Sequence, residues 1–142
     1  MNSDEWRKAT NLLKPRKFHT CLSIKGDNNR IERVIVMGGR SLFGDQSQTV
    51  EILDVDTMQF KYGPPLPKAI SRFSSVVSYA EHSHGRIYVL GGKDVNKKDL
   101  SSIYVASAEM LSNQTWEYIG DMTRKRSHFH TFVLPDNFFP KC

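Results

Sequence analysis

The chain has 142 residues, a length typical of one globular domain. With 39% hydrophobic and 25% charged residues, it has the composition of a folded soluble chain and not of a disordered one. Its two cysteines, Cys21 and Cys142, exclude a disulfide-rich scaffold and a zinc site of four cysteines. No apolar stretch approaches the roughly 20 residues that a membrane helix needs, and the first residues lack the apolar core of a signal peptide. We therefore expect no membrane association and a reducing, cytoplasmic location.

The net charge of +5 is concentrated at the start of the chain. Residues 1–40 hold nine Lys and Arg against four Asp and Glu, whereas the remaining residues hold eleven of each. A nucleic-acid-binding protein usually gathers its basic residues into a patch with aromatic residues for stacking. Here apolar runs typical of strands separate the basic residues. The pattern favours solvated strand edges and loops over nucleic-acid binding.

Three sequence markers recur in the same order along the chain. An aromatic residue followed by a short run of β-branched and small residues begins at Phe18, Phe73 and Phe129, 55 and 56 residues apart. A continuous apolar run ends in two glycines, 53 residues apart, at Gly38-Gly39 and Gly91-Gly92. A large aromatic residue stands six residues before an apolar one at Trp6, Phe60 and Trp116. A common period near 55 residues indicates a repeat architecture.

The elements of one unit follow from local chemistry. Residues 18–24 and 34–37 have the continuous apolar or β-branched character of buried strands. Residues 49–55 alternate polar and apolar positions as a half-buried strand does, and Asp56-Thr57 is a good turn start. Residues 60–62 form a short fourth strand, which Gly63-Pro64-Pro65 ends. Four short strands in about 50 residues predict an all-β fold built from the blades of a β-propeller.

At this point the sequence resembles the kelch-repeat family. The resemblance rests on an ordered set of motifs: Arg-aromatic-His before a strand, a β-branched run ending in Gly-Gly, the strand Val-Glu-Ile-Leu-Asp, and then Phe or Trp. It covers nearly the whole chain. The family's Tyr-Asp pair is replaced here by Leu53-Asp54, and in the second unit the pair has no counterpart.

The strand count predicts a partial propeller occupying residues 1–142. Residues 18–62 and 73–119 form two complete four-stranded blades, residues 1–12 provide the last strand of a preceding blade, and residues 127–134 provide the first strand of a following blade. Because a propeller needs about four to eight blades to close, two blades do not form a ring. We expect a truncated product, with association with further blades or copies as the alternative.

The candidate chemical groups favour structural roles over catalytic ones. The phosphate-binding motif needs a glycine five residues before Gly92 and Ser or Thr after Lys93, but the chain has Ile87 and Asp94 at these positions. We therefore expect the two glycine pairs to serve close packing and positive φ. His19 and His130 recur with the repeat, which favours a structural role over metal binding. Cys21 is expected to be a buried thiol. We therefore predict no catalytic residue, no cofactor and no metal.

What remains is a binding surface. Strand parity places the loops 14–17, 40–48, 64–71, 93–100 and 123–127 on one rim, which kelch propellers use for protein binding. The rim candidates for contact with a partner, in particular an acidic peptide, are Arg40, Phe43, Lys93, Arg16, Arg72 and Arg126. For Arg16, Arg72 and Arg126, a framework role that recurs with the repeat is the alternative. For Arg40, Phe43 and Lys93 the structural alternative stays open.

Two functions from different classes follow from the resemblance. The first is a non-catalytic protein-interaction module, in particular part of a substrate-recognition propeller of a ubiquitin-ligase adaptor. The second is a fragment of an oxidase-like propeller of the galactose-oxidase type, which needs Tyr, Cys and His ligands from several blades; that ligand set has no match here. The resemblance favours the first.

Overall fold

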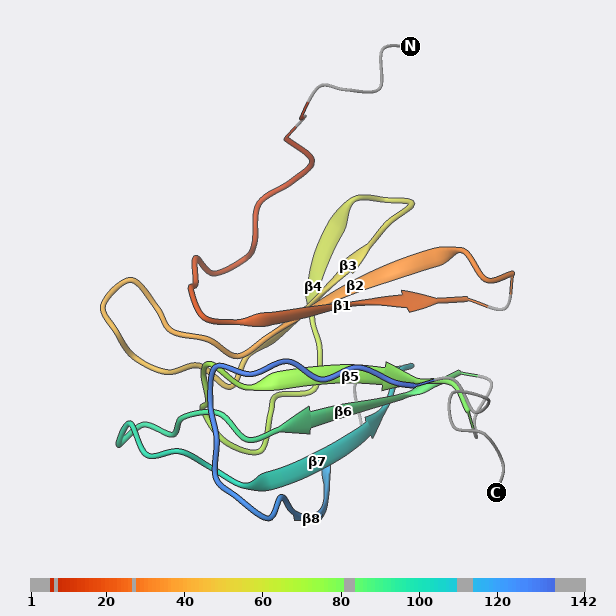
Figure 1. Ribbon diagram of the computed structural model, residues 1–142. Helices are drawn as coiled ribbons and strands as arrows, with labels where there is room; N and C mark the ends of the chain where they lie inside the picture. Colours follow the sequence, from red (N-terminus) through yellow and green to blue (C-terminus); the bar gives the residue numbers. More distant parts are fainter. Residues whose placement is uncertain (1–5, 7, 27, 81–83, 110–113, 135–142) are drawn as a thin grey trace, which may run out of the picture.

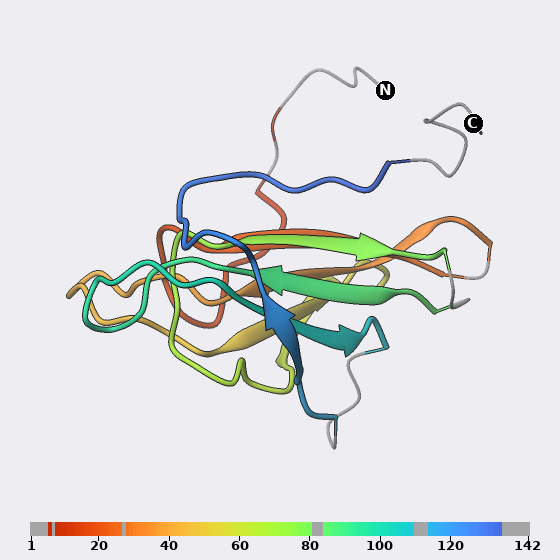
Figure 2. The ribbon, with the colours of Figure 1, turned by 60° about the horizontal axis from the view of Figure 1, so that its bottom comes forward.

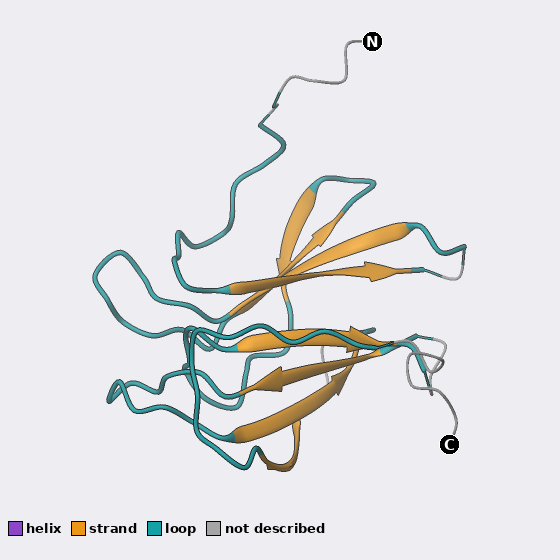
Figure 3. Cartoon of the chain, in the orientation of Figure 1, coloured by secondary structure: helices purple, strands orange, loops and turns teal. Residues whose placement is uncertain are grey.

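The protein forms two four-stranded antiparallel sheets in sequence order (Figure 1). The structure is a computed structural model that describes residues 6, 8–26, 28–80, 84–109 and 114–134. Within these ranges there are strands, turns and loops but no helix (Figure 3). The first sheet contains β1 (Thr20–Lys25), β2 (Ile31–Met37), β3 (Val50–Asp54) and β4 (Gln59–Tyr62), and the second contains β5 (Ser74–Ser78), β6 (Arg86–Leu90), β7 (Ser102–Ser107) and β8 (Glu117–Asp121). The predicted all-β fold with two complete blades is confirmed.

The strands occur where the apolar patterns predict them, and side chains close the turns between them. The apolar run of β2 is buried at Ile35, Val36 and Met37. At the end of β3, Oδ1 of Asp54 accepts hydrogen bonds from the backbone N–H (2.8 Å) and hydroxyl (2.9 Å) of Thr57. These bonds, the backbone one first, lower the pKa of Asp54. The turn chemistry therefore fixes the β3–β4 hairpin.

The two sheets share one hydrophobic core. The first sheet contributes Ile24, Ile35, Met37, Val50 and Ile52, and the second contributes Phe73, Ile87, Val89, Ala106 and Ala108, with Leu66 and Ile70 of the connecting segment between them. All of these residues are buried. Neighbouring units of a repeat protein are stabilised by burying their apolar faces against one another. The two blades therefore form a single packed unit.

Backbone hydrogen bonds align Phe18 with Arg72, one residue before the Phe73 with which the sequence marker paired it. The N–H of Arg72 donates to the carbonyl of Phe18 (3.0 Å), and the N–H of His128 donates to the carbonyl of Arg72 (2.9 Å). These three residues also share a φ near +58°. Phe18, Arg72 and His128 are thus equivalent, which places Phe73 at the position of His19. Pairing Phe18 with Phe73 was wrong by one residue, because backbone geometry and not the aromatic side chain defines the repeat position.

The two segments predicted as strands of further blades form no strand in the described part of the chain. Residues 127–134 run beside β5 (Figures 1 and 2), where the hydroxyls of Ser74 and Thr131 are hydrogen-bonded (2.8 Å), just as those of Thr20 and Ser75 are between β1 and β5 (2.9 Å). Trp6 is fully exposed, and residues 1–5 and 7 lie outside the described residues. Among the described residues, neither segment is paired into one of the two sheets. Their membership of further blades stays a prediction.

Cys21 is exposed, so the expectation of a buried thiol was wrong. Alternate residues of a strand point to opposite faces of its sheet. In β1 the half-buried Leu22 and the buried Ile24 pack into the shared core, whereas Cys21 and Ser23 are exposed on the other face. This is the face of the first blade that points away from the second.

Candidate binding rim

Five loops lie together at one end of the two blades (Figure 1): three lead into residues 18–25, β5 and residues 127–134, and two connect β2 to β3 and β6 to β7. We call this surface the rim; it comprises residues 14–17, 40–48, 64–71, 93–100 and 123–127, which gather on the left in Figures 1 and 2. Isolated antiparallel bridges join Lys17 to Arg40 and Ser71 to Lys93. The side-chain amide of Gln46 also donates to the carbonyl of Asp94, which links the longest loops of the two blades. The rim is therefore a connected surface.

The rim holds the positive charge of the chain. Its loops contain eleven Lys and Arg against three Asp, whereas the rest of the sequence contains nine Lys and Arg against twelve Asp and Glu. Counting along the sequence attributed the excess to residues 1–40. The fold instead gathers basic residues from both blades at one end. Such a field attracts an acidic partner and accelerates its association.

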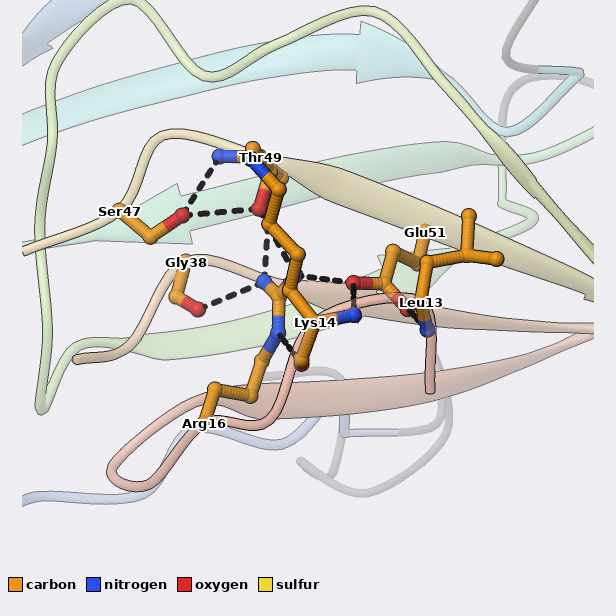
Figure 4. A network of polar contacts seen from close by, with 7 residues as sticks. All are labelled: Leu13, Lys14, Arg16, Gly38, Ser47, Thr49 and Glu51. Atoms are coloured by element: carbon orange, nitrogen blue, oxygen red, sulfur yellow. Dashed lines mark hydrogen bonds and ion pairs between the residues drawn. The ribbon is translucent and has the colours of Figure 1, made fainter. Parts of the chain in front are cut away.

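Arg16 is buried within the rim and contacts only the protein itself (Figure 4). Its guanidinium donates to the carbonyls of Gly38 (2.9 Å) and Thr49 (3.1 Å) and to the hydroxyl of Thr49 (2.7 Å), and it forms an ion pair with Glu51. Its side chain is 2% exposed and that of Glu51 is 0% exposed. The structure thus gives Arg16 the framework role that the sequence left open.

Glu51 also fixes the segment that leads into the first blade. Its carboxylate accepts the backbone N–H groups of Leu13 (2.7 Å) and Lys14 (3.1 Å) in addition to the guanidinium of Arg16. A buried charge is tolerated when it is paired and fully hydrogen-bonded. Sequence reasoning missed Glu51 because it lies in a strand, 35 residues away from its partner.

Arg40 and Phe43 belong to the β2–β3 loop. The Arg40 backbone bridges Lys17 and Gln46, and its Nε donates to the carbonyl of Gly44 (2.9 Å). It forms no ion pair in the part of the chain that the structure describes. Phe43 is 95% exposed, and its neighbour Leu42 is 72% exposed. The loop therefore presents a two-residue apolar tip, of which the sequence analysis identified only Phe43.

Lys93 is partly neutralised within its own loop. Its Nζ lies 2.7 Å from Oδ1 of Asp99 and donates to the carbonyl of Lys97 (3.3 Å). The hydrogen bond from Lys93, followed by one from Ser127, lowers the pKa of Asp99. Lys93 therefore orders the β6–β7 loop as well as contributing charge, and Val95 is the exposed apolar residue of this loop.

Arg72 and Arg126 differ in environment and do not occupy one repeat position. Arg72, equivalent to Phe18, is half-buried, with its guanidinium 4.2 Å from the centroid of the Phe18 ring. Gly39 donates to the carbonyl of Ile70 and Gly92 donates to that of Arg126, so Ile70 and Arg126 are equivalent. Arg16 holds the same position, because Arg16 and Ile70 lie two residues before the equivalent residues Phe18 and Arg72. Unlike Arg16, Arg126 is exposed, 5.8 Å from the centroid of Phe129. The three arginines are therefore not one recurring framework series.

The glycine pairs and marker aromatics hold the blades in place. Gly38, Gly39, Gly91 and Gly92 all have positive φ, between 59° and 97°. A Cβ on Gly38 would lie 2.6 Å from the Phe73 ring, so the pair also permits close packing between blades. Phe60 pairs with Leu53 in the first sheet, and Trp116 packs on the core and donates to the Pro64 carbonyl (3.4 Å). The glycine pairs and marker aromatics thus lie where strands and blades meet, and their structural role stays a prediction.

Other kinds of site have no support among the described residues. They contain no group of three or more His, Cys, Asp or Glu side chains placed to hold a metal ion. They also contain no helix long and apolar enough to cross a membrane. His82 lies outside the described residues, and the pKa of His19 is lowered by burial and by Arg16.

Two antiparallel four-stranded sheets that pack face to face, with paired glycines at the end of each second strand, have the arrangement of neighbouring β-propeller blades, in keeping with the resemblance to kelch repeats. Among curated proteins, the chain is similar to Kelch-like protein 40 of Mus musculus, with 28% identity over 137 residues. The alignment covers 95% of this chain and 20% of that protein, so the chain spans about a fifth of its relative's length. No protein-family model matches the sequence.

Proposed function

We propose that this chain is a non-catalytic protein-binding module whose rim binds an acidic segment of a partner protein. The observation that carries the proposal is the charge of the rim, eleven basic against three acidic residues, in a chain whose remainder is net acidic. Kelch repeats and the likeness to a Kelch-like protein support a binding role. Loops carried by a rigid scaffold are where binding residues concentrate.

Within the rim, the β2–β3 loop offers the best anchor. Exposed Leu42 and Phe43 supply apolar contact area, and Arg40 beside them is free of any carboxylate within the described chain. Arg clamps a carboxylate with two hydrogen bonds, and aromatic residues dominate binding energy at interfaces. The expected ligand therefore combines acidic residues with at least one apolar side chain. Apolar tips beside the basic residues favour a protein over a nucleic acid.

A peptide selection tests this function. Random peptides displayed on phage are selected on the chain, and binding of the enriched peptides is measured by fluorescence anisotropy. We expect acidic peptides, and we expect the double variant Leu42→Ser/Phe43→Ser to weaken their binding by about 30-fold, the size of an interface hot spot. Arg40→Ala should weaken binding by about 10-fold. The matched control is Ile31→Ser/Met58→Ser, which removes two exposed apolar side chains outside the rim.

Three outcomes would contradict this function. The selected peptides show no acidic enrichment, the control variant weakens binding as much as the rim variant does, or a 20-nucleotide single strand binds more tightly than any selected peptide. In the last case, a steep loss of affinity with salt would identify phosphate contacts.

The finer assignments are also proposals. The kelch resemblance supports a role in substrate recognition for a ubiquitin-ligase adaptor, and the exposed Cys21 thiol suits the reducing cytoplasm. The equivalence of Arg126 to Arg16, together with exposed Phe132 beyond it, supports association with a further blade or with another copy to close a propeller. Such a blade would offer Arg126 an acidic residue at the position that Glu51 holds in the first blade.

A further inference from the structure

The second blade contains a cavity at the rim for which the repeat supplies an explanation. It has a volume of about 260 Å³ and opens to solvent. Its walls come from the start of β7, the last strand β8 and three rim loops. The lining residues are Lys68, Leu100, Ser101, Ser102, Tyr104, Tyr118, Asp121 and Lys125.

This cavity is the second blade's counterpart of the Arg16 site. Gly38 donates to the carbonyl of Thr49, and Gly91 donates to that of Ser102, both at 3.0 Å, so Thr49 and Ser102 are equivalent. Two residues further on, Glu51 is opposite Val36 and Tyr104 is opposite Val89. The equivalence of Phe18 and Arg72, which lie 54 residues apart, makes Lys68 the counterpart of Lys14. The cavity lining therefore matches the walls that hold Arg16 in Figure 4.

The cavity is open because both partners of the buried ion pair are replaced. Ile70 occupies the position of Arg16, and Tyr104 occupies that of Glu51. Ile70 is buried in the shared core, 3% exposed, and carries no group that reaches toward Ser102. The polar walls remain, whereas the guanidinium that fills the first blade's site is missing.

The lining is rich in hydrogen-bond donors. Asp121 is already satisfied, because it accepts the hydroxyls of Ser101 (2.8 Å) and Tyr118 (2.7 Å). Lys68 and Lys125 line the same cavity, and after these two bonds their charges lower the pKa of Asp121 further. In the described structure the hydroxyls of Ser102 and Tyr104 and the ammonium groups of Lys68 and Lys125 form no hydrogen bond with the protein. Two lysines and two residues with uncommitted hydroxyls, Ser102 and Tyr104, thus line the cavity, and the two positive charges outnumber the single carboxylate of Asp121.

We propose that this cavity binds an oxyanion of the phosphate type, either free or carried on a side chain of the partner. Two lysines supply the charge, and the hydroxyls of Ser102 and Tyr104 donate hydrogen bonds to the oxygens. The volume accommodates a phosphate together with the side chain that carries it. The partner-borne form rests on the proposed function of the rim, whereas the site for free phosphate does not.

The test is a titration of the chain with inorganic phosphate at constant ionic strength, followed by amide chemical shifts. We expect saturable shifts confined to residues 101–104, 118–121 and their neighbours. Lys68→Ala/Lys125→Ala should weaken binding at least tenfold. The matched control, Lys97→Ala/Lys98→Ala, removes two charges from the same rim outside the cavity and should change the affinity less than twofold. Equal losses in the two variants, or shifts spread along the whole rim, would overturn the site.

A second variant closes the cavity while keeping the fold. Ile70→Arg/Tyr104→Glu transplants the ion pair of the first blade into the second, and we expect phosphate binding to be lost while the chain stays folded by its amide spectrum. Undiminished binding in a folded variant would also overturn the site. Replacement of the hydroxyl alone, in Tyr104→Phe, should weaken binding about fivefold.

Peptides separate the two sources of the oxyanion. Gly-phosphoserine-Gly binding more tightly than inorganic phosphate, with Gly-Ser-Gly inert, indicates a partner-borne phosphate; the reverse order indicates a free anion. Binding of phosphate with no acidic peptide recovered from the rim selection would support the cavity and contradict the proposed function. Recovery of acidic peptides with no phosphate binding would support the proposed function and contradict the cavity.

Discussion

Glu51→Ala is expected to lower the free energy of unfolding by about 3–5 kcal/mol, because it leaves the buried guanidinium of Arg16 without its countercharge. The side chains of Arg16 and Glu51 are 2% and 0% exposed, so water does not replace the lost carboxylate. The backbone N–H groups of Leu13 and Lys14 lose their acceptor as well. The measurement is urea unfolding followed by tryptophan fluorescence and by circular dichroism.

The chain offers an exposed ion pair as the matched control. Arg30 and Asp56 lie 2.5 Å apart, with side chains 62% and 67% exposed. Asp56→Ala should therefore cost no more than about 1 kcal/mol, the range of surface pairs. Similar losses in Glu51→Ala and Asp56→Ala would contradict the buried network.

The second blade shows how the pair can be replaced. At the same two positions it carries Ile70 and Tyr104, and a buried pair replaced by well-packed residues is often neutral for stability. We therefore expect Arg16→Ile/Glu51→Tyr to recover most of the stability lost in Glu51→Ala. A double variant as unstable as the single one would show that the two blades are not equivalent at these positions.

Gly92→Ala is the other change with a large expected effect. At φ of +97° a side chain is strained by about 1–3 kcal/mol. A Cβ there would also lie 2.6 Å from Cβ of Phe73 and 2.8 Å from the carbonyl oxygen of Ser71. Overpacking of this kind adds about 1–3 kcal/mol. We expect a total loss of about 2–6 kcal/mol in urea unfolding.

Gly44 is the matched control, because it has the backbone strain of Gly92 without the close contacts to backbone and to Phe73. Its φ is +96°, but a Cβ would meet only the flexible Nη2 of Arg40, at 3.3 Å. Gly44→Ala should therefore lose about 1–2 kcal/mol, the cost of the backbone conformation alone. If Gly44→Ala were as destabilising as Gly92→Ala, the close approach of Gly92 to the inner strand would be refuted.

The strands and their order were predictable because backbone requirements mark the sequence strongly. Paired glycines at the end of an apolar run reflect positive φ and close packing, and Gly63-Pro64-Pro65 marks the end of β4. These requirements repeat with every blade, so the period is visible in one sequence. The rim loops follow from strand parity alone.

What the sequence did not reveal depends on contacts between distant side chains. Arg16 and Arg126 look alike along the chain, yet one is buried beside Glu51 and the other is exposed. Glu51 occupies a polar position of an alternating strand, which ordinarily faces solvent. The cavity arises from two replacements, at Ile70 and Tyr104, and is visible only once the repeat register is known from backbone hydrogen bonds.

The two blades pack face to face through one core, with Phe73 of the second blade seated on Gly38 of the first. The most direct measurement is a nuclear Overhauser spectrum of the chain. We predict a strong cross-peak between the Gly38 Hα protons and the Phe73 ring, together with cross-peaks between the side-chain Hβ protons of Thr20 and Ser75, whose hydroxyls lie 2.9 Å apart across the two sheets. A well-dispersed spectrum with no cross-peak between residues 18–62 and 73–119 would contradict it.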